Sequence, residues 1–85
     1  MKSEMNSGEI CWLDTLKIGQ SAKVMNIKIM DKSKKRHLLD MGITRGVIIQ
    51  IKKIAPLGDP IDIKLRDYEL CLRKEDLKHI QVQVL

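Results

Sequence analysis

Apolar and polar side chains alternate through much of the second half of the chain, and this pattern predicts short β-strands. Residues 61–65 and 68–72 each place apolar side chains at every second position, as half-buried strands do. Because the two runs meet at Arg66 and Asp67, they predict a tight hairpin in which Asp67 adopts the left-handed turn conformation. Further strands are predicted over three segments rich in apolar or β-branched residues: 22–29, 47–54 and 80–84.

The alternation is interrupted inside the predicted strand over residues 22–29. Met25, Ile27 and Ile29 share one parity, and Val24 falls on the other. A β-bulge, or burial of the strand on both faces, would explain the break in phase.

A short helix is predicted between the strands over residues 22–29 and 47–54. Asp31 and Ser33 are both suitable N-cap residues for a helix over about 34–41. Gly42 follows as a left-handed C-terminal cap, with Ile43 placed for the hydrophobic contact that accompanies such caps.

These elements together predict a small, mainly β domain. One short helix, a helical turn at 74–78 before the last strand, and roughly five strands fit a small antiparallel barrel. The domain is expected to span residues 12–85. Residues 1–11 are polar and lack periodicity, so they are expected to form a flexible N-terminal leader.

The positive charge of the chain is concentrated in its centre. The formal net charge is +5, and residues 21–55 hold nine basic and two acidic residues. Many of these bases lie in the run 32–36, which is either a solvated helix start or a docking surface for an acidic partner. Aromatic residues make up only 2% of the chain, so it lacks platforms for stacking nucleic-acid bases. A small basic barrel that binds RNA or DNA is therefore the alternative and not the leading interpretation.

The sequence gives no sign of catalysis, a cofactor or a metal site. It has no nucleophile-elbow, dinucleotide, phosphate-loop or zinc-protease motif. His37, His79, Cys11 and Cys71 show no local ligand spacing, so no metal ligands are expected. The two separate cysteines are expected to stay reduced, which suits the cytoplasm, and no apolar run is long enough for membrane insertion.

Residues 37–60, HLLDMGITRGVIIQIKKIAPLGDP, carry a recognisable combination of motifs. The combination is similar to the FeoA family of ferrous iron transport proteins. It consists of the run Leu38 to Gly42, then Gly46, then the loop from Ala55 to Pro60, and the similarity covers residues 13–84. The sequence departs from the usual family pattern at Arg45, where many members have proline, and at Asp67, where glycine is common.

The resemblance implies a cytoplasmic SH3-like barrel that is not an enzyme. It implies a partner, the membrane transporter FeoB, contacted at its cytoplasmic G-protein domain or its membrane part, and an effect on transport or GTP hydrolysis. A catalytic arginine supplied to the partner, Arg36 or Arg45, is a further alternative. Because a similar barrel closes some iron-dependent repressors, a wider role as an iron-related adaptor also stays open. A weak homo-oligomer is a separate alternative.

The candidate partner-binding residues come from the helix, the segment after it and the 56–60 loop. A basic rim around apolar side chains is the expected chemistry of such a contact. The candidates are Lys35, Arg36, Leu39, Met41, Arg45, Leu57 and Asp59.

Overall fold

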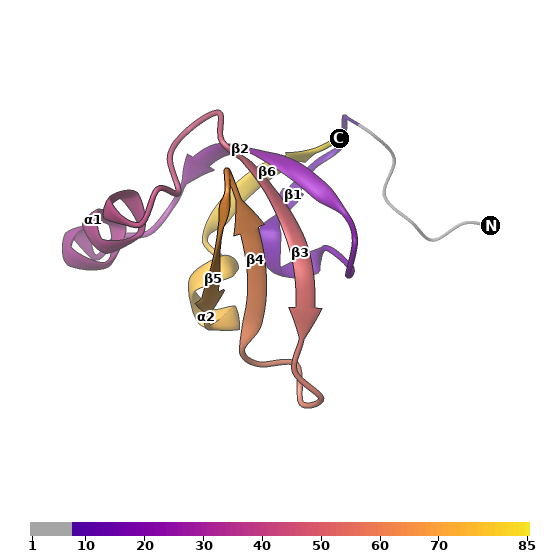
Figure 1. The fold of residues 1–85 in the computed structure, drawn as a ribbon. Helices are drawn as coiled ribbons and strands as arrows, with labels where there is room; N and C mark the ends of the chain where they lie inside the picture. The colour runs from indigo at the N-terminus through magenta and orange to yellow at the C-terminus, as the bar shows by residue number, and fades with distance from the viewer. Residues whose placement is uncertain (1–7) are drawn as a thin grey trace.

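The computed structural model describes residues 8–85 and shows six antiparallel strands with two short helices (Figure 1). The predicted mainly β fold, with a helix after the first long strand and a helical turn before the last, is confirmed. The helices are α1 (Lys32–Asp40) and α2 (Lys74–Leu77), and a 3-10 turn, η1 (Leu13–Thr15), precedes the first long strand. The strands are β1 (Ile10–Trp12), β2 (Ser21–Ile27), β3 (Ile48–Ile54), β4 (Ile61–Leu65), β5 (Tyr68–Leu72) and β6 (Ile80–Val84).

All six strands belong to one sheet, in the order β1-β6-β2-β3-β4-β5. The sheet curves around the interior, but its hydrogen bonding is open, because β1 and β5 are the two edges and do not pair with each other. Helix α1 extends outward from the end of β2, and the loop between β3 and β4 projects at a separate corner (Figure 1). These two projections hold five of the seven candidate partner-binding residues, and the other two, Met41 and Arg45, lie in the segment between α1 and β3.

Alternate strand positions build the core, as the polarity pattern predicts. In β4, Ile61, Ile63 and Leu65 are buried, while Lys64 between them is exposed. The eighteen buried side chains of the described residues are all aliphatic, and none of them is polar. This single apolar layer is what the curved sheet encloses.

The predicted break in the phase of β2 is a β-bulge. The pairing of β2 with β6 shifts between Val24 and Asn26, which leaves Met25 as the extra residue. A bulge bends its strand and turns one side chain toward a new direction. Here it lies where β2 passes α1.

The N-terminus of α1 is capped by Asp31. Its Oδ1 accepts hydrogen bonds from the backbone N–H of Ser33 at 2.9 Å and of Lys34 at 3.3 Å. Because Asp31 and not Ser33 is the cap, the helix begins at Lys32, two residues earlier than predicted.

The C-terminus of α1 has the predicted glycine cap. Gly42 has a φ of 98°, and its N–H donates to the carbonyl of Leu39 at 3.0 Å. The N–H of Ile43 donates to the carbonyl of Leu38 at 3.1 Å, and both of these side chains are buried. This is the Schellman arrangement, which satisfies the last carbonyls of the helix and turns the chain back toward the sheet.

Tyr68 of β5 fixes the end of α1 against the sheet. Its hydroxyl donates a hydrogen bond to the carbonyl of Met41 at 2.6 Å. A Cβ atom added at Gly42 would meet that same hydroxyl. Gly42 is therefore required both for its left-handed backbone and for the close approach of Tyr68.

Three details differ from the sequence-based expectations. In the β4–β5 hairpin the left-handed residue is Arg66, with a φ of 56°, and not Asp67. Ile10 and Cys11 belong to β1, which pairs with β6, so the predicted leader ends too late in the chain; residues 1–7 lie outside the described part. Met30 carries a flexible thioether side chain of the kind that fills core gaps, but it is 97% exposed.

The double role of Gly42 predicts an unequal effect of two alanine substitutions. Gly46 also has a positive φ, 91°, but no atom lies within 4 Å of a Cβ built there. We expect Gly46→Ala to lower the free energy of unfolding by about 1–2 kcal/mol through backbone strain alone. Gly42→Ala adds the clash with Tyr68 and is expected to cost about 1–3 kcal/mol more. Urea unfolding of both variants measures the difference.

Tyr68→Phe supplies the control, because it removes the hydroxyl that the new Cβ would meet. In a chain that already carries Tyr68→Phe, the further change Gly42→Ala is expected to cost no more than Gly46→Ala does. An equal cost of Gly42→Ala with and without Tyr68→Phe would contradict the close approach of the tyrosine hydroxyl.

Candidate partner-binding surface

A small groove separates helix α1 from strand β2. It has a volume of about 80 Å³ and lies beside the bulge of β2. We call it the α1–β2 groove. Its lining residues are Val24, Met25, Asn26, Ile27, Lys35, Leu39 and Arg45.

Local structure explains why these side chains meet. Lys35 and Leu39 are four residues apart and therefore lie on the same side of α1. Leu38 points into the core, which leaves Leu39 37% exposed beside the groove. Arg45 lies in a turn that is bonded to β2 directly after it. The N–H of Gly46 donates to the carbonyl of Val24 at 2.8 Å, and the N–H of Val24 donates to the carbonyl of Val47 at 2.9 Å.

The groove brings together three of the seven candidate residues, namely Lys35, Leu39 and Arg45. Met41 is close in sequence but is half-buried against the core. Arg36 does not line the groove, and its Nε lies 3.6 Å from Oδ1 of Asp40 in an exposed ion pair along the helix.

The other two candidates lie in the β3–β4 loop and do not line the groove. Leu57 is 96% exposed. Asp59 has a structural partner, because its Oδ1 accepts a hydrogen bond from the backbone N–H of Lys74 at 2.7 Å. Lys74 opens α2, whose N-cap residue, Arg73, makes no side-chain capping bond. Asp59 therefore caps α2 from a distant loop.

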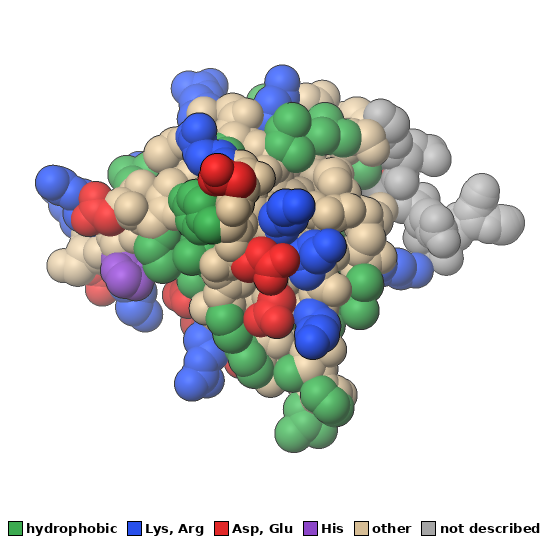
Figure 2. Space-filling model, in the orientation of Figure 1, with side chains coloured by type: hydrophobic (Ala, Val, Ile, Leu, Met, Phe, Trp, Pro, Cys, Tyr) green, Lys and Arg blue, Asp and Glu red, His purple; other side chains and the backbone are tan. Residues whose placement is uncertain are grey.

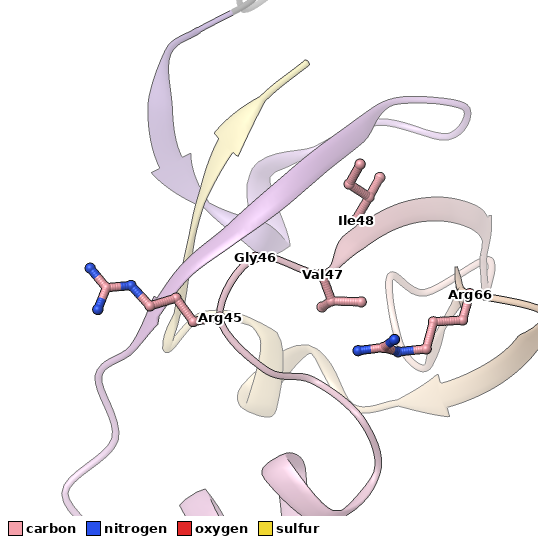
Figure 3. A pocket seen from close by; sticks show the side chains of 5 residues that line it. All are labelled: Arg45, Gly46, Val47, Ile48 and Arg66. Atoms are coloured by element: carbon pink, nitrogen blue, oxygen red, sulfur yellow. The ribbon is translucent and has the colours of Figure 1, made fainter.

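A second hollow lies on the outer face of the sheet, and sequence reasoning did not single it out. Two shallow depressions of about 460 and 350 Å³ share Ile48 and Arg66. Figure 3 shows Arg66 and Arg45 on opposite sides of the first depression, with the guanidinium of Arg45 pointing away from Arg66. Arg45 therefore faces the α1–β2 groove, while Arg66 belongs to the outer face.

The exposed thiol of Cys71 lies in β5 opposite Asp62 of β4. A hydrogen bond to the Asp62 carboxylate raises the pKa of Cys71, with partial desolvation and the negative charge of Asp62 acting in the same direction. At a given pH, less of this thiol is therefore in the reactive thiolate form than for an ordinary cysteine.

No helix in residues 8–85 is long and apolar enough to cross a membrane. Within the same range, no three His, Cys, Asp or Glu side chains gather closely enough to hold a metal ion.

The sequence profile described as the FeoA domain matches residues 11–84. The chain belongs to the FeoA family. A curated FeoA-family relative is the Fe(2+) transport protein A/Fe(2+) transporter FeoB fusion protein of Porphyromonas gingivalis, which is 33% identical over 73 residues. That match covers 86% of this chain and 8% of the fusion protein, so the chain spans a small part of that relative.

Solved FeoA structures share the fold. The solution structure of a FeoA-like protein from Clostridium acetobutylicum is 42% identical, with a TM-score of 0.81, covering 95% of this chain and 91% of that one. FeoA of Stenotrophomonas maltophilia, solved with zinc and described as a prokaryotic SH3 domain protein, is 21% identical. Its TM-score is 0.74, covering 85% of this chain and 88% of that one, and at this identity the likeness shows the fold alone. The predicted SH3-like fold is thereby confirmed.

The bond from Asp59 to α2 predicts a structural effect of its removal. Asp59→Ala is expected to lower the free energy of unfolding by about 1 kcal/mol, because the Lys74 N–H loses its acceptor. Leu57→Ala, two residues away and exposed, is the control and is expected to change stability by less than about 0.5 kcal/mol. Equal stabilities of the two variants in thermal unfolding would contradict the capping role.

Asp62→Asn is expected to make the Cys71 thiol more reactive. The substitution removes the carboxylate that raises the pKa of Cys71, so the thiolate fraction increases at a given pH. Alkylation by iodoacetamide at pH 8, followed by mass spectrometry, is expected to be faster at Cys71. Cys11, in the same sample, serves as the internal control, and an unchanged rate ratio between the two thiols would contradict the assignment.

Proposed function

We propose that this FeoA-family protein is a non-enzymatic cytoplasmic regulator of ferrous iron uptake that binds an FeoB-type transporter and changes its transport or GTP hydrolysis. The observation that supports the partner is the fusion protein of Porphyromonas gingivalis, in which a segment similar to this chain shares a polypeptide with FeoB. Two domains joined in one chain meet at a high effective concentration, so even a weak contact between them can be used.

The α1–β2 groove is the surface that we assign to this contact. Its apolar side, with Leu39 and Met25, suits one hydrophobic side chain of the partner. Lys35 and Arg45 stand at its border, and among the described residues neither forms an ion pair. The groove therefore fits an apolar side chain flanked by carboxylates.

The size of the groove predicts a modest affinity. A volume of about 80 Å³ accommodates one side chain. Burying one leucine-sized side chain contributes roughly 1.5–3 kcal/mol, which by itself does not give tight binding. A contact of this strength suits regulation that depends on the state of the transporter.

The two candidate arginines differ in whether they are free to contact the partner. Arg36 is engaged with Asp40, and Arg45 is not paired within the described part of the chain. Arg45 is therefore the better placed of the two to reach charge on the partner, including phosphate charge at a G-protein site.

The surface gives the nucleic-acid alternative no comparable support. Trp12 and Tyr68 are the only aromatic side chains of the chain, and neither lines the groove or the outer-sheet depressions. On the face shown in Figure 2, Lys and Arg side chains are interspersed with Asp and Glu and do not form a continuous basic surface. Continuous basic tracks are what phosphate backbones require.

Binding to the purified FeoB-type transporter of the same organism, measured in detergent with and without a GTP analogue, tests the function and the site. We expect Leu39→Asp and Arg45→Glu each to weaken binding about tenfold, through a buried charge in the groove and a reversed charge at its border. Leu57→Asp and Arg36→Glu make the same chemical changes outside the groove and are expected to change the Kd less than about threefold.

The outcomes separate the function from the site. Failure of the unmodified chain to bind the transporter or to alter its GTP hydrolysis and iron transport would contradict the proposed function. Loss of binding in Leu57→Asp but not in Leu39→Asp would support the transporter as the partner but contradict the groove as the site, and would assign the contact to the β3–β4 loop.

A further inference from the structure

Two rows of outward-facing side chains cross strands β2, β3 and β4. The register places Lys23 beside Ile48, and Arg66, in the turn directly after β4, lines both depressions together with Ile48. The next row holds Ser21, Gln50 and Lys64, which are also paired in register. An exposed isoleucine thus stands between a lysine and an arginine, with a second lysine diagonal to it.

We propose that this outer-sheet surface, made of Lys23, Ile48, Gln50, Lys64 and Arg66, binds an extended acidic peptide segment with an apolar residue seated on Ile48. The proposal concerns a site separate from the α1–β2 groove and does not depend on the identity of the partner there.

Charge complementarity favours an acidic occupant. Among the described residues none of Lys23, Lys64 and Arg66 forms an ion pair. The nearest acidic residues in the register are Glu69, opposite Lys64, and Asp67, beside Arg66 in the turn. Lys23 has the uncharged Gln83 and Ile48 as its cross-strand neighbours, so it is the least compensated of the three cations.

The spacing of these cations fits an extended peptide. Lys23 and Arg66 are two strands apart, which corresponds to about 10 Å between their backbones. In an extended peptide, side chains on the same face repeat about every 7 Å, so two acids flanking one apolar residue span about 14 Å. The long lysine and arginine side chains bridge this small difference, and the central side chain falls on Ile48.

The surface suits a peptide better than a membrane. Ile48 is half-exposed and is the single large apolar side chain among the lining residues of the two depressions apart from the buried Val47. A membrane surface would favour several apolar side chains together, with no acidic residues at the border.

The conformation of Arg66 is a second, independent observation. Its φ of 56° is one that glycine, asparagine and aspartate adopt more readily than arginine. Residues held in such backbone conformations cluster at functional sites, so this conformation favours a functional role for the Arg66 side chain. In Figure 3 the side chain of Arg66 runs back toward Val47, with which it lines the first depression.

The test uses the full chain and the fluorescein-labelled nonapeptide ESESLSESE, with fluorescence anisotropy at 50 mM salt. We expect saturable binding that weakens at higher salt and at least fivefold weaker binding of the peptide with serine in place of leucine. Arg66→Glu is expected to weaken binding about tenfold. Lys52→Glu is the control: it makes the same change of charge about 13 Å from Ile48 along β3, outside both depressions. It is expected to change the Kd less than twofold.

Arg66→Asn separates binding from folding. Asparagine tolerates the left-handed turn, so the thermal midpoint is expected to stay or rise while peptide binding falls at least fivefold. Absence of peptide binding, or equal weakening by Lys52→Glu and Arg66→Glu, would overturn the proposal. So would displacement of the peptide by phosphatidylserine vesicles that bind the chain in an Arg66-dependent manner, since this would assign the surface to a membrane.

Discussion

The inner face of the six-stranded sheet carries most of the side chains that leave water when this chain folds. Twelve of the eighteen buried aliphatic residues lie in its strands, the other six come from the helices and connections that pack against it, and none of the described buried residues is polar or aromatic. A domain of this size buries only about 60–65% of its unfolded surface, so the loss of one strand face would remove much of its stability. A one-residue slip in register would expose that face, and the alternation therefore fixes every outward position as well.

Elements governed by local chemistry could be predicted from the sequence. The bulge of β2 follows from the phase break at Val24, and the end of α1 follows from Gly42 and Ile43, because both signals lie within a few residues of their effect. Strand β1 could not be predicted, since three residues carry no periodicity and its partner, β6, lies at the other end of the chain. The assignment of the left-handed turn to Asp67 was wrong because intrinsic preference favours Asp, whereas the hairpin geometry places Arg66 there.

The candidate site was predictable only where helical spacing decides it. Lys35 and Leu39 meet because four residues make about one helical turn, and Arg45 joins them because the helix cap folds the next turn back onto β2. Asp59 illustrates the opposite case: a carboxylate in a projecting loop looks available for a partner, yet it caps α2 fifteen residues later. The outer-sheet surface was missed because Lys23, Ile48 and Arg66 are far apart in sequence, and only the strand register aligns them.

The two surfaces are not mechanically independent, although their side chains point apart. Arg45 borders the groove, and Ile48, at the centre of the outer face, follows three positions later, a span of at most about 10 Å. The two residues between them, Gly46 and Val47, are both held by backbone hydrogen bonds to Val24, next to the bulge. A partner that presses α1 against β2 acts on the strand that also carries Lys23. The bulge of β2, which first shows as a break in the alternation of the sequence, is therefore the point at which a contact in the groove can affect the outer face.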